Sequence, residues 1–296
     1  MSSSSFSSPV TLVTAFYIVK DKDQGSLVPL DGFKGIHWRI DHFRSLAKLG
    51  IPLCVFGDAT TAPYISDFLS GGDYPHVKLV EGVRYEDLTV YGLCCDPGNG
   101  DGVGEGKKKK EYELPRHRDV KKDTREYMTL MNCKIEFVQR AMDLDPFHTN
   151  LFAWIDFSIA YIFKTPSETL EALRTMIVDR RFQREVMATP GYWGVRQNSD
   201  ILNQIHWRFA GSIFIGTRAL LSQLYAVYLK ALPTFLSKYG TIVWEVNFWK
   251  WLEETDQFQF GWYKIDNDDY DNMFRLPDAC FLPSTSSSST FSSMDG

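Results

Sequence analysis

Two acidic residues stand inside apolar segments of this sequence and are the first candidates for chemistry. Asp156 lies in NLFAWIDFSIAYIF, residues 150–163, and Glu245 lies in VWEVNFW, residues 243–249. A carboxylate is costly to bury unless it is hydrogen-bonded, paired with a cation or bound to a metal. We therefore expect Asp156 to have a partner, and a divalent cation is one candidate because it prefers carboxylate oxygens. The alternative is that Asp156 only caps the turn after a strand.

The segments before Asp156 predict the element that positions it. Runs of β-branched and aromatic residues at 10–19 and 51–57 are typical of buried strands, and helical spacing between them completes a strand–helix–strand unit. A short helix within 61–72 precedes a third strand at 76–82. Such alternation predicts an α/β fold with a mostly parallel sheet. Asp156 would then lie at the carboxyl end of a buried strand, where ligands collect in open α/β sheets.

Further elements continue the alternation to the end of the chain. Thr124 is a candidate N-cap, with Glu126 in the first turn of the helix that follows it. Helices are predicted over 124–142, 167–188, 218–236 and 241–254, and strands at 209–218 and at the beginning of 260–274.

Composition limits the class of protein. The 296 residues are 44% hydrophobic and 15% aromatic, enough to bury a large core. A net charge of −5 gives no general attraction to nucleic acid or to an anionic membrane. No stretch reaches the ~18 apolar residues of a membrane-spanning helix. The five cysteines show no metal-site or disulfide spacing, which indicates a reducing compartment and a cytoplasmic location.

Low-complexity segments predict the domain boundaries. Residues 1–9 lack the features of a secretory signal and are expected to be a disordered leader, and residues 277–296 a low-complexity tail. Residues 96–123 are expected to form a flexible insertion. Its DPGNGDGVGEGKKKK sequence superficially suggests a phosphate-binding loop, but it lacks the first glycine and the final Ser or Thr of G-x-x-x-x-G-K-[ST]. Its lysines are better explained as solvated.

A family resemblance rests on the order of several segments. These are VTLVTAFYIV, PLCVFGD, YMTLMNCKIEFVQRA, FAWIDFSIAY, RFAGSIFIGTR and VWEVNFW. In this order they resemble the bacterial HtrL/YibB family, which comprises glycosyltransferases of the GT-A type. The resemblance implies one GT-A-like domain over 10–276 with a Rossmann-type sheet. It implies transfer of a sugar from a nucleotide diphosphate donor, UDP-linked, to a glycan or other hydroxyl acceptor.

The resemblance also implies a donor site. Asp156 corresponds to the DxD region of such enzymes, whose carboxylates bind Mn²⁺ or Mg²⁺ on the donor diphosphate. Here that region holds one carboxylate where the usual motif holds two. The first strand end, Thr14, Ala15, Phe16 and Tyr17, would hold the nucleotide base, the alternative being that these aromatic residues belong to the core. Lys134 is expected to contact phosphate or ribose, ahead of Arg125.

Catalytic and acceptor residues are implied in the second half. Glu245 would be the carboxylate near the anomeric carbon, although it could also be a helix-surface residue beside tryptophans. Arg208, Gly211 and Ser212 resemble the acceptor region. Six tryptophans cluster there: Trp193, Trp207, Trp244, Trp249, Trp251 and Trp262. Aromatic faces can bind the C–H surfaces of sugars, but most of these tryptophans are expected to be core.

Two other functions fit parts of the pattern. A noncatalytic carbohydrate- or protein-binding module on a transferase scaffold would explain the single carboxylate and the absence of a histidine after His206. A phosphohydrolase of the aspartyl-phosphate type fits less well, because the DFSI sequence that begins at Asp156 lacks the second aspartate.

Overall fold

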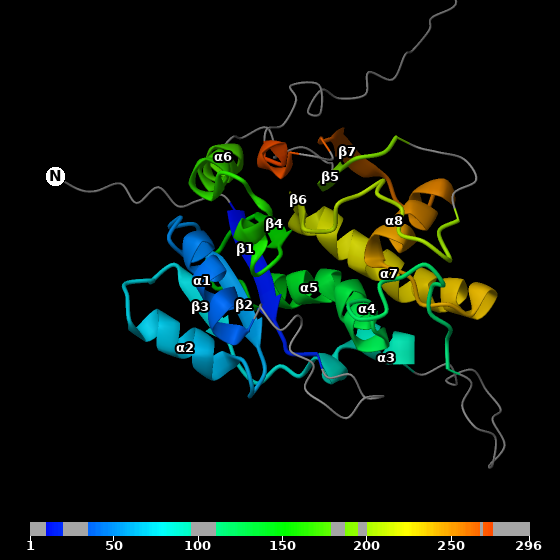
Figure 1. Ribbon diagram of the computed structural model, residues 1–296, viewed down its shortest axis with the longest axis horizontal. Coiled ribbons are helices and arrows are strands. Elements are labelled where there is room, and N and C mark those ends of the chain that lie inside the picture. The colour runs from blue at the N-terminus through cyan, green and yellow to red at the C-terminus, as the bar shows by residue number, and fades with distance from the viewer. Residues whose placement is uncertain are drawn as a thin grey trace, which may run out of the picture.

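The computed structural model describes residues 10–19, 35–95, 111–178, 187–194, 200–266 and 269–274 (Figure 1). Its strands form one seven-stranded sheet in the order β3-β2-β1-β4-β6-β5-β7. The strands are β1 Val10–Phe16, β2 Leu53–Gly57, β3 Val77–Val80, β4 Leu151–Ile155, β5 Met187–Gly191, β6 Ile213–Thr217 and β7 Phe260–Lys264. Strand β6 runs antiparallel to both of its neighbours, and the other paired strands are parallel. The predicted fold class, an α/β fold with a mostly parallel sheet flanked by helices, is confirmed.

Helices cover both faces of this sheet (Figure 1). The α-helices are α1 Ile36–Ala47, α2 Ala62–Ser70, α3 Thr89–Cys95, α4 Arg125–Asn132, α5 Lys134–Leu144, α6 Pro166–Val178, α7 Arg218–Tyr239 and α8 Glu245–Glu254. Short 3-10 helices are η1 Tyr85–Asp87, η2 Ile159–Ile162 and η4 Tyr270–Asn272. Buried side chains of α1, α2 and α6 pack on one face, and those of α3, α4, α5, α7 and α8 pack on the other.

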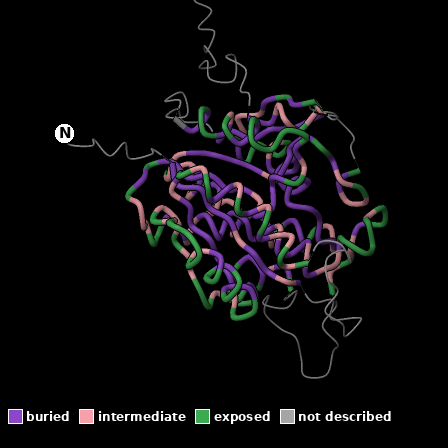
Figure 2. The backbone as a smooth tube through the Cα atoms, turned by 60° about the vertical axis from the view of Figure 1, so that its left-hand side comes forward, coloured by how far each residue is buried: buried purple, intermediate pink, exposed green. Residues whose placement is uncertain are grey.

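The alternation of side chains along β4 shows why this strand is apolar throughout. Phe152 and Trp154 pack into the core below α5 and α7, whereas Leu151, Ala153 and Ile155 pack into the core below α1 and α6. All of its residues are buried, and Figure 2 shows buried backbone through the centre of the molecule. A strand covered on both faces needs apolar residues at every position. The chain leaves the core at the end of β4, and Asp156 is the first residue after this strand.

Two predicted helices differ from the observed elements. The helix expected over 124–142 is divided into α4 and α5, because Cys133 donates its N–H to the nearer Leu130 carbonyl in a tight turn. The Thr124 cap is confirmed: its hydroxyl accepts from the N–H of Tyr127. The helix expected over 167–188 ends within the described residues at Val178, and Met187 already belongs to β5.

The predicted flexible insertion lies only partly within the described residues. Residues 96–110, like 1–9 and 275–296, lie outside them. Residues 111–123 are hydrogen-bonded to the second half of the chain: Glu113 pairs with Gly240 and Ile242, and the N–H of His117 donates to Asn203. This part is therefore more than a connector, and it forms one side of the cavity described below.

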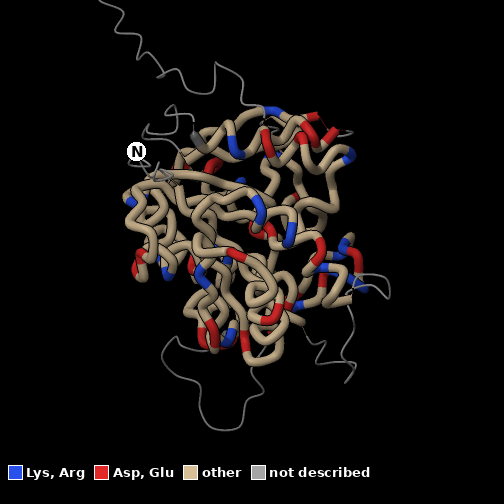
Figure 3. Tube along the Cα trace, turned by 90° about the vertical axis from the view of Figure 1, so that its left-hand side faces the viewer, with Lys and Arg blue, Asp and Glu red and all other residues tan. Residues whose placement is uncertain are grey.

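Helix α7 is the one described helix with the length and apolar composition to cross a membrane. Seven of its side chains are buried, among them Leu221, Leu224 and Phe235 in the core beside the sheet. Burial of this kind is typical of a core helix. Figure 3 shows acidic and basic residues interspersed along the described chain, in agreement with the small net charge of −5.

Candidate functional site

The carboxyl ends of the parallel strands meet at one edge of the sheet. Tyr17 follows β1 and Asp156 follows β4. Because β6 runs in the opposite direction, the residues that precede it, Gly211 and Ser212, reach the same edge. The N–H of Asp156 donates to the carbonyl of Ser212 at 2.9 Å, which joins β4 and β6 there.

A cavity of about 570 Å³ opens at this edge. All of the residues predicted for the site except Thr14 and Arg208 line it, namely Ala15, Phe16, Tyr17, Lys134, Asp156, Gly211, Ser212 and Glu245. They come from segments far apart in the sequence. The fold therefore brings together residues that the resemblance had connected only by their order along the chain.

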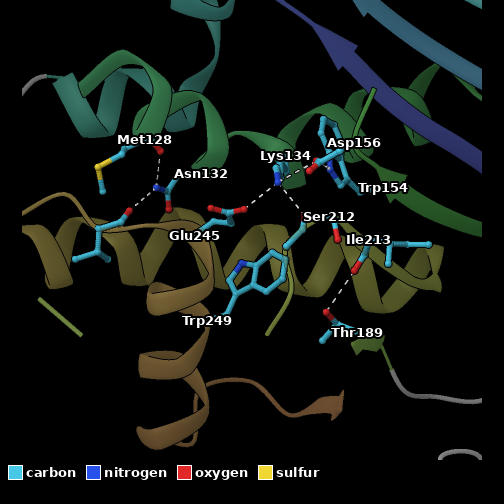
Figure 4. Close-up of polar contacts among 12 residues, drawn as sticks. Met128, Asn132, Lys134, Trp154, Asp156, Thr189, Ser212, Ile213, Glu245 and Trp249 are labelled. Carbon is cyan, nitrogen blue, oxygen red and sulfur yellow. Dashed lines mark hydrogen bonds and ion pairs between the residues drawn. The ribbon is translucent and has the colours of Figure 1, made fainter. Parts of the chain in front are cut away.

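The centre of the site is a buried lysine between two carboxylates. Lys134 Nζ lies 2.9 Å from Glu245 Oε1, 3.1 Å from Asp156 Oδ1 and 2.8 Å from the carbonyl oxygen of Gly211 (Figure 4). An ammonium group has three protons to donate, so these partners use all of them. Lys134 therefore holds Asp156 and Glu245 in place and has no proton left for the phosphate that the sequence predicted as its partner.

Charge on the two carboxylates keeps this lysine protonated. Burial alone lowers the pKa of Lys134, because it disfavours the charged form, but Asp156 and Glu245 outweigh burial and raise the pKa above its usual value. Lys134 is thus a fixed positive charge at neutral pH, and it is not suited to act as a base.

Glu245 begins α8 and is held closely against Gly211. A Cβ atom on residue 211 would lie 2.3 Å from Glu245 Oε1, so the carboxylate occupies space that any other residue type would need. Only 7% of the Glu245 side chain is exposed, compared with 40% for Asp156. Both carboxylates line the cavity, but Asp156 is the more accessible of the two.

The described residues around Asp156 do not make a metal site. Asp156 Oδ1 accepts from Lys134 Nζ at 3.1 Å and from Trp154 Nε1 at 2.8 Å, so this oxygen already has two donors. No group of three or more His, Cys, Asp or Glu side chains that could hold a metal occurs in the described part of the chain. The predicted Mn²⁺ or Mg²⁺ ligand set is therefore not found among the described residues.

The aromatic rings at the first strand end pack against other rings of the protein. The Phe16 ring stacks on Phe157 at 4.6 Å, and Tyr17 stacks on Phe137 at 5.5 Å while its hydroxyl donates to the Val83 carbonyl. Both rings are buried, as the core alternative expected. Thr14 is also buried and does not line the cavity.

Arg208 is held away from the cavity by an ion pair. Its Nε and Nη2 donate to the two oxygens of Glu253 at 2.9 and 2.8 Å, and its guanidinium lies 4.2 Å from the centre of the Trp262 ring. This bidentate pairing and stacking fix the α8 helix to the segment before β6. The acceptor role expected for Arg208 has no support in this geometry.

Two basic residues of the cavity were missed by the sequence interpretation. Arg39 of α1 and Lys122 of the 111–123 segment both line it. Lys122 Nζ lies 5.6 Å from the centre of the Tyr127 ring, and its pKa is raised by the charges around it, chiefly Tyr127 and then Asp123. The polar composition around Lys122 is typical of a connector, so no pattern distinguished it from a solvated lysine.

Comparisons with known proteins give distant structural similarity alone. Neither a family model nor a curated protein matches the sequence. Among solved structures, 4-diphosphocytidyl-2C-methyl-D-erythritolsynthase from Anaerococcus prevotii aligns over 89% of this chain and 88% of its own, with 10% identity and a TM-score of 0.40. A similarity of this extent does not support a functional assignment.

Proposed function

We propose that this protein is a glycosyltransferase that moves a sugar from a nucleotide diphosphate donor, UDP-linked, to a hydroxyl acceptor. The observation that carries the proposal is the convergence of Asp156, Lys134 and Glu245 at the carboxyl edge of the sheet, beside the end of β1, in a cavity of about 570 Å³. This is the edge at which open α/β sheets bind ligands. The volume suits a nucleotide-sized ligand.

In this proposal the donor binds on the β1 side of the cavity. Backbone groups at Ala15, Phe16 and Tyr17 would read the base, since the two aromatic rings already pack against protein rings. All three N–H groups of the Lys134 ammonium already donate hydrogen bonds within the protein. Arg39 and Lys122 would therefore bind the phosphates. Basic side chains of this kind neutralise the charge that develops on a departing diphosphate.

The transfer uses a carboxylate as proton acceptor. The bond between the anomeric carbon and the phosphate oxygen breaks, and its electron pair leaves with the nucleoside diphosphate. The acceptor oxygen bonds to the anomeric carbon, and its proton passes to a carboxylate. Exposure favours Asp156 for this step, whereas Glu245 would orient Lys134 and stabilise the centre.

The HtrL/YibB resemblance supports the same assignment from the sequence, and membership of that family is part of the proposal. So is the role of Mn²⁺ or Mg²⁺.

Thermal stability with UDP tests the proposal. We expect UDP to raise the melting temperature, because a ligand that binds only the folded state stabilises it. The measurement is repeated with UDP plus Mn²⁺ and with UDP plus EDTA. We expect most of the shift to persist in EDTA, since the described residues supply basic side chains and no metal cluster. If no nucleoside diphosphate stabilises the protein in any of these conditions, the proposal is wrong.

Variants separate binding from transfer. Asp156→Asn should retain the UDP shift and lose hydrolysis of a UDP-sugar, and Glu245→Gln should reduce hydrolysis less. Asp67→Asn is a matched control because Asp67 is exposed on α2 and does not line the cavity. Sugar binding without any donor hydrolysis in the wild-type protein would instead favour a noncatalytic binding module.

A further inference from the structure

Exposed aromatic residues gather at the cavity. The large hydrophobic side chains exposed among the described residues are Tyr64, Val120, Leu144, Tyr161, Trp207 and Tyr270. Of these, the aromatic residues Tyr161, Trp207 and Tyr270 line the cavity. Three of the six clustered tryptophans are buried, namely Trp244, Trp249 and Trp251, whereas Trp207 is exposed. Trp207 therefore stands out from the cluster as a surface that a ligand can reach.

Trp207 and Tyr270 are held in place by a buried tyrosine. The Tyr192 ring meets the Trp207 ring at 5.9 Å and 82°, and the Tyr270 ring at 6.0 Å and 90°. Backbone N–H groups of Tyr192 and Trp193 both donate to the carbonyl of Trp207, at 3.0 and 2.9 Å. We call Tyr192, Trp207 and Tyr270 the aromatic wall. Trp207 and Tyr270 each remain 37% exposed, although both rings contact the Tyr192 ring.

The order of the strands places the aromatic wall across the cavity from the donor side. Tyr192 follows β5 and Tyr270 follows β7, whereas Ala15–Tyr17 lie at the end of β1. Asp156, at the end of β4, lies between them, because the sheet order is β1-β4-β6-β5-β7 in this region. With strands ~4.8 Å apart, the wall begins roughly 10 Å from Asp156. A sugar residue fits in that interval.

Polar groups beside the wall complete a surface typical of carbohydrate binding. Ser212 lines the cavity, and its hydroxyl has only the weak sulfur acceptor of Met273, at 3.6 Å, as a side-chain partner among the described residues. Aromatic faces cover the apolar C–H surface of a pyranose, and a hydroxyl and a carboxylate bind its hydroxyl groups. A purely apolar ligand would offer no hydrogen bond to the exposed side of the Asp156 carboxylate or to the Ser212 hydroxyl.

We propose that the aromatic wall is the acceptor subsite and that the acceptor is a carbohydrate, with one sugar face on Trp207 and Tyr270 and a hydroxyl directed at Asp156. The acceptor role of this sugar rests on the proposed function, whereas carbohydrate binding at the aromatic wall does not depend on it.

Glycan binding tests the inference directly. The protein is applied to an array of neutral and acidic glycans, and the strongest ligand is measured by saturation-transfer NMR and by tryptophan fluorescence. We expect Trp207→Ala and Tyr270→Ala each to weaken binding about threefold to tenfold, the range of a single aromatic contact, and Trp207→Phe to recover part of the loss. Tyr64→Ala is the matched control, because Tyr64 is 39% exposed but does not line the cavity.

The outcomes separate this inference from the proposed function. Unchanged circular dichroism and an unchanged UDP shift in the Trp207 and Tyr270 variants would show that the fold and the donor side are intact. The inference is overturned if no glycan binds, or if Trp207→Ala and Trp207→Phe bind it as tightly as the wild type. Glycan binding that is lost in these variants supports the inference even if UDP has no effect, in which case the proposed transfer fails alone.

Discussion

The ammonium group of Lys134 and the carboxylate of Glu245 form a buried ion pair with 2.9 Å between Nζ and Oε1. Their side chains are only 4% and 7% exposed. The same ammonium lies 3.1 Å from Asp156, which remains partly solvated. A pair this deep keeps its geometry because neither partner can be solvated alone. The ion pair therefore orients two carboxylates at the cavity and contributes little net free energy to folding.

Removal of one partner should be much worse than removal of both. Lys134→Met leaves Glu245 buried without a cation, and we expect the free energy of unfolding to fall by about 3–5 kcal/mol. Lys134→Met combined with Glu245→Leu should recover much of that loss, since an apolar pair of similar volume replaces the ions. Urea unfolding measures the free energy of unfolding of the single and the double variant. The exposed pair Arg174–Glu171 is the control, and Glu171→Gln should change little. Equal losses in the single and double variants would contradict this account.

Lys134 should stay protonated throughout the neutral and mildly alkaline range. Burial lowers its pKa, but Asp156 and Glu245 raise it further than burial lowers it. A raised folded-state pKa means that its contribution to stability is fully present below the unfolded value of 10.5 and is lost as pH rises through the folded value. An NMR titration of the lysine side chains, with Lys134→Arg used for assignment, measures this. Titration between pH 7 and 9 would show instead that burial dominates.

Gly211 should be intolerant of even a methyl group. A Cβ atom there would lie 2.3 Å from Glu245 Oε1 and 3.1 Å from Val246 Cγ1, so Gly211→Ala must move the carboxylate away from Lys134. We expect a loss of about 1–3 kcal/mol in unfolding free energy. Gly92→Ala is the matched control, because Gly92 lies in α3 with no atom within 4 Å of its Cβ position. It should stabilise the protein slightly. The same small change in both variants would mean that Glu245 moves without cost.

The sequence predicted the strands that carry the site better than the contacts within it. Local patterns identified β1, β2 and β4, and they placed Asp156 at the end of β4 because the apolar run stops there. They did not reveal β5, since the buried segment MATPG has no alternation that separates a strand from a buried helix. Nor did they show that β6 is antiparallel, because strand direction is decided by long-range pairing.

The roles of individual residues depended on contacts between distant segments. Lys134 was expected to bind phosphate or ribose, but its three N–H groups donate within the protein. One of the acceptors is the carbonyl of Gly211, which lies far along the chain. Glu245 was expected near the reacting atoms; it lines the cavity, but its side chain is less exposed than that of Asp156. Lys122 lies in a segment whose polar sequence resembles a connector, and only its packing beside Tyr127 brings it to the cavity.

Arg208 should matter for stability rather than for ligand binding. Its guanidinium bonds both oxygens of Glu253 and stacks on Trp262, a geometry that an ammonium group cannot reproduce. We expect Arg208→Lys to lower the unfolding free energy by about 1.5–3 kcal/mol, the value of a lost hydrogen bond to a charged group. Because Arg208 does not line the cavity, the folded variant should bind UDP and glycans as the wild type does. Urea unfolding and fluorescence titration below the melting temperature separate the two effects. Weakened glycan binding with unchanged stability would restore the acceptor role predicted from the sequence.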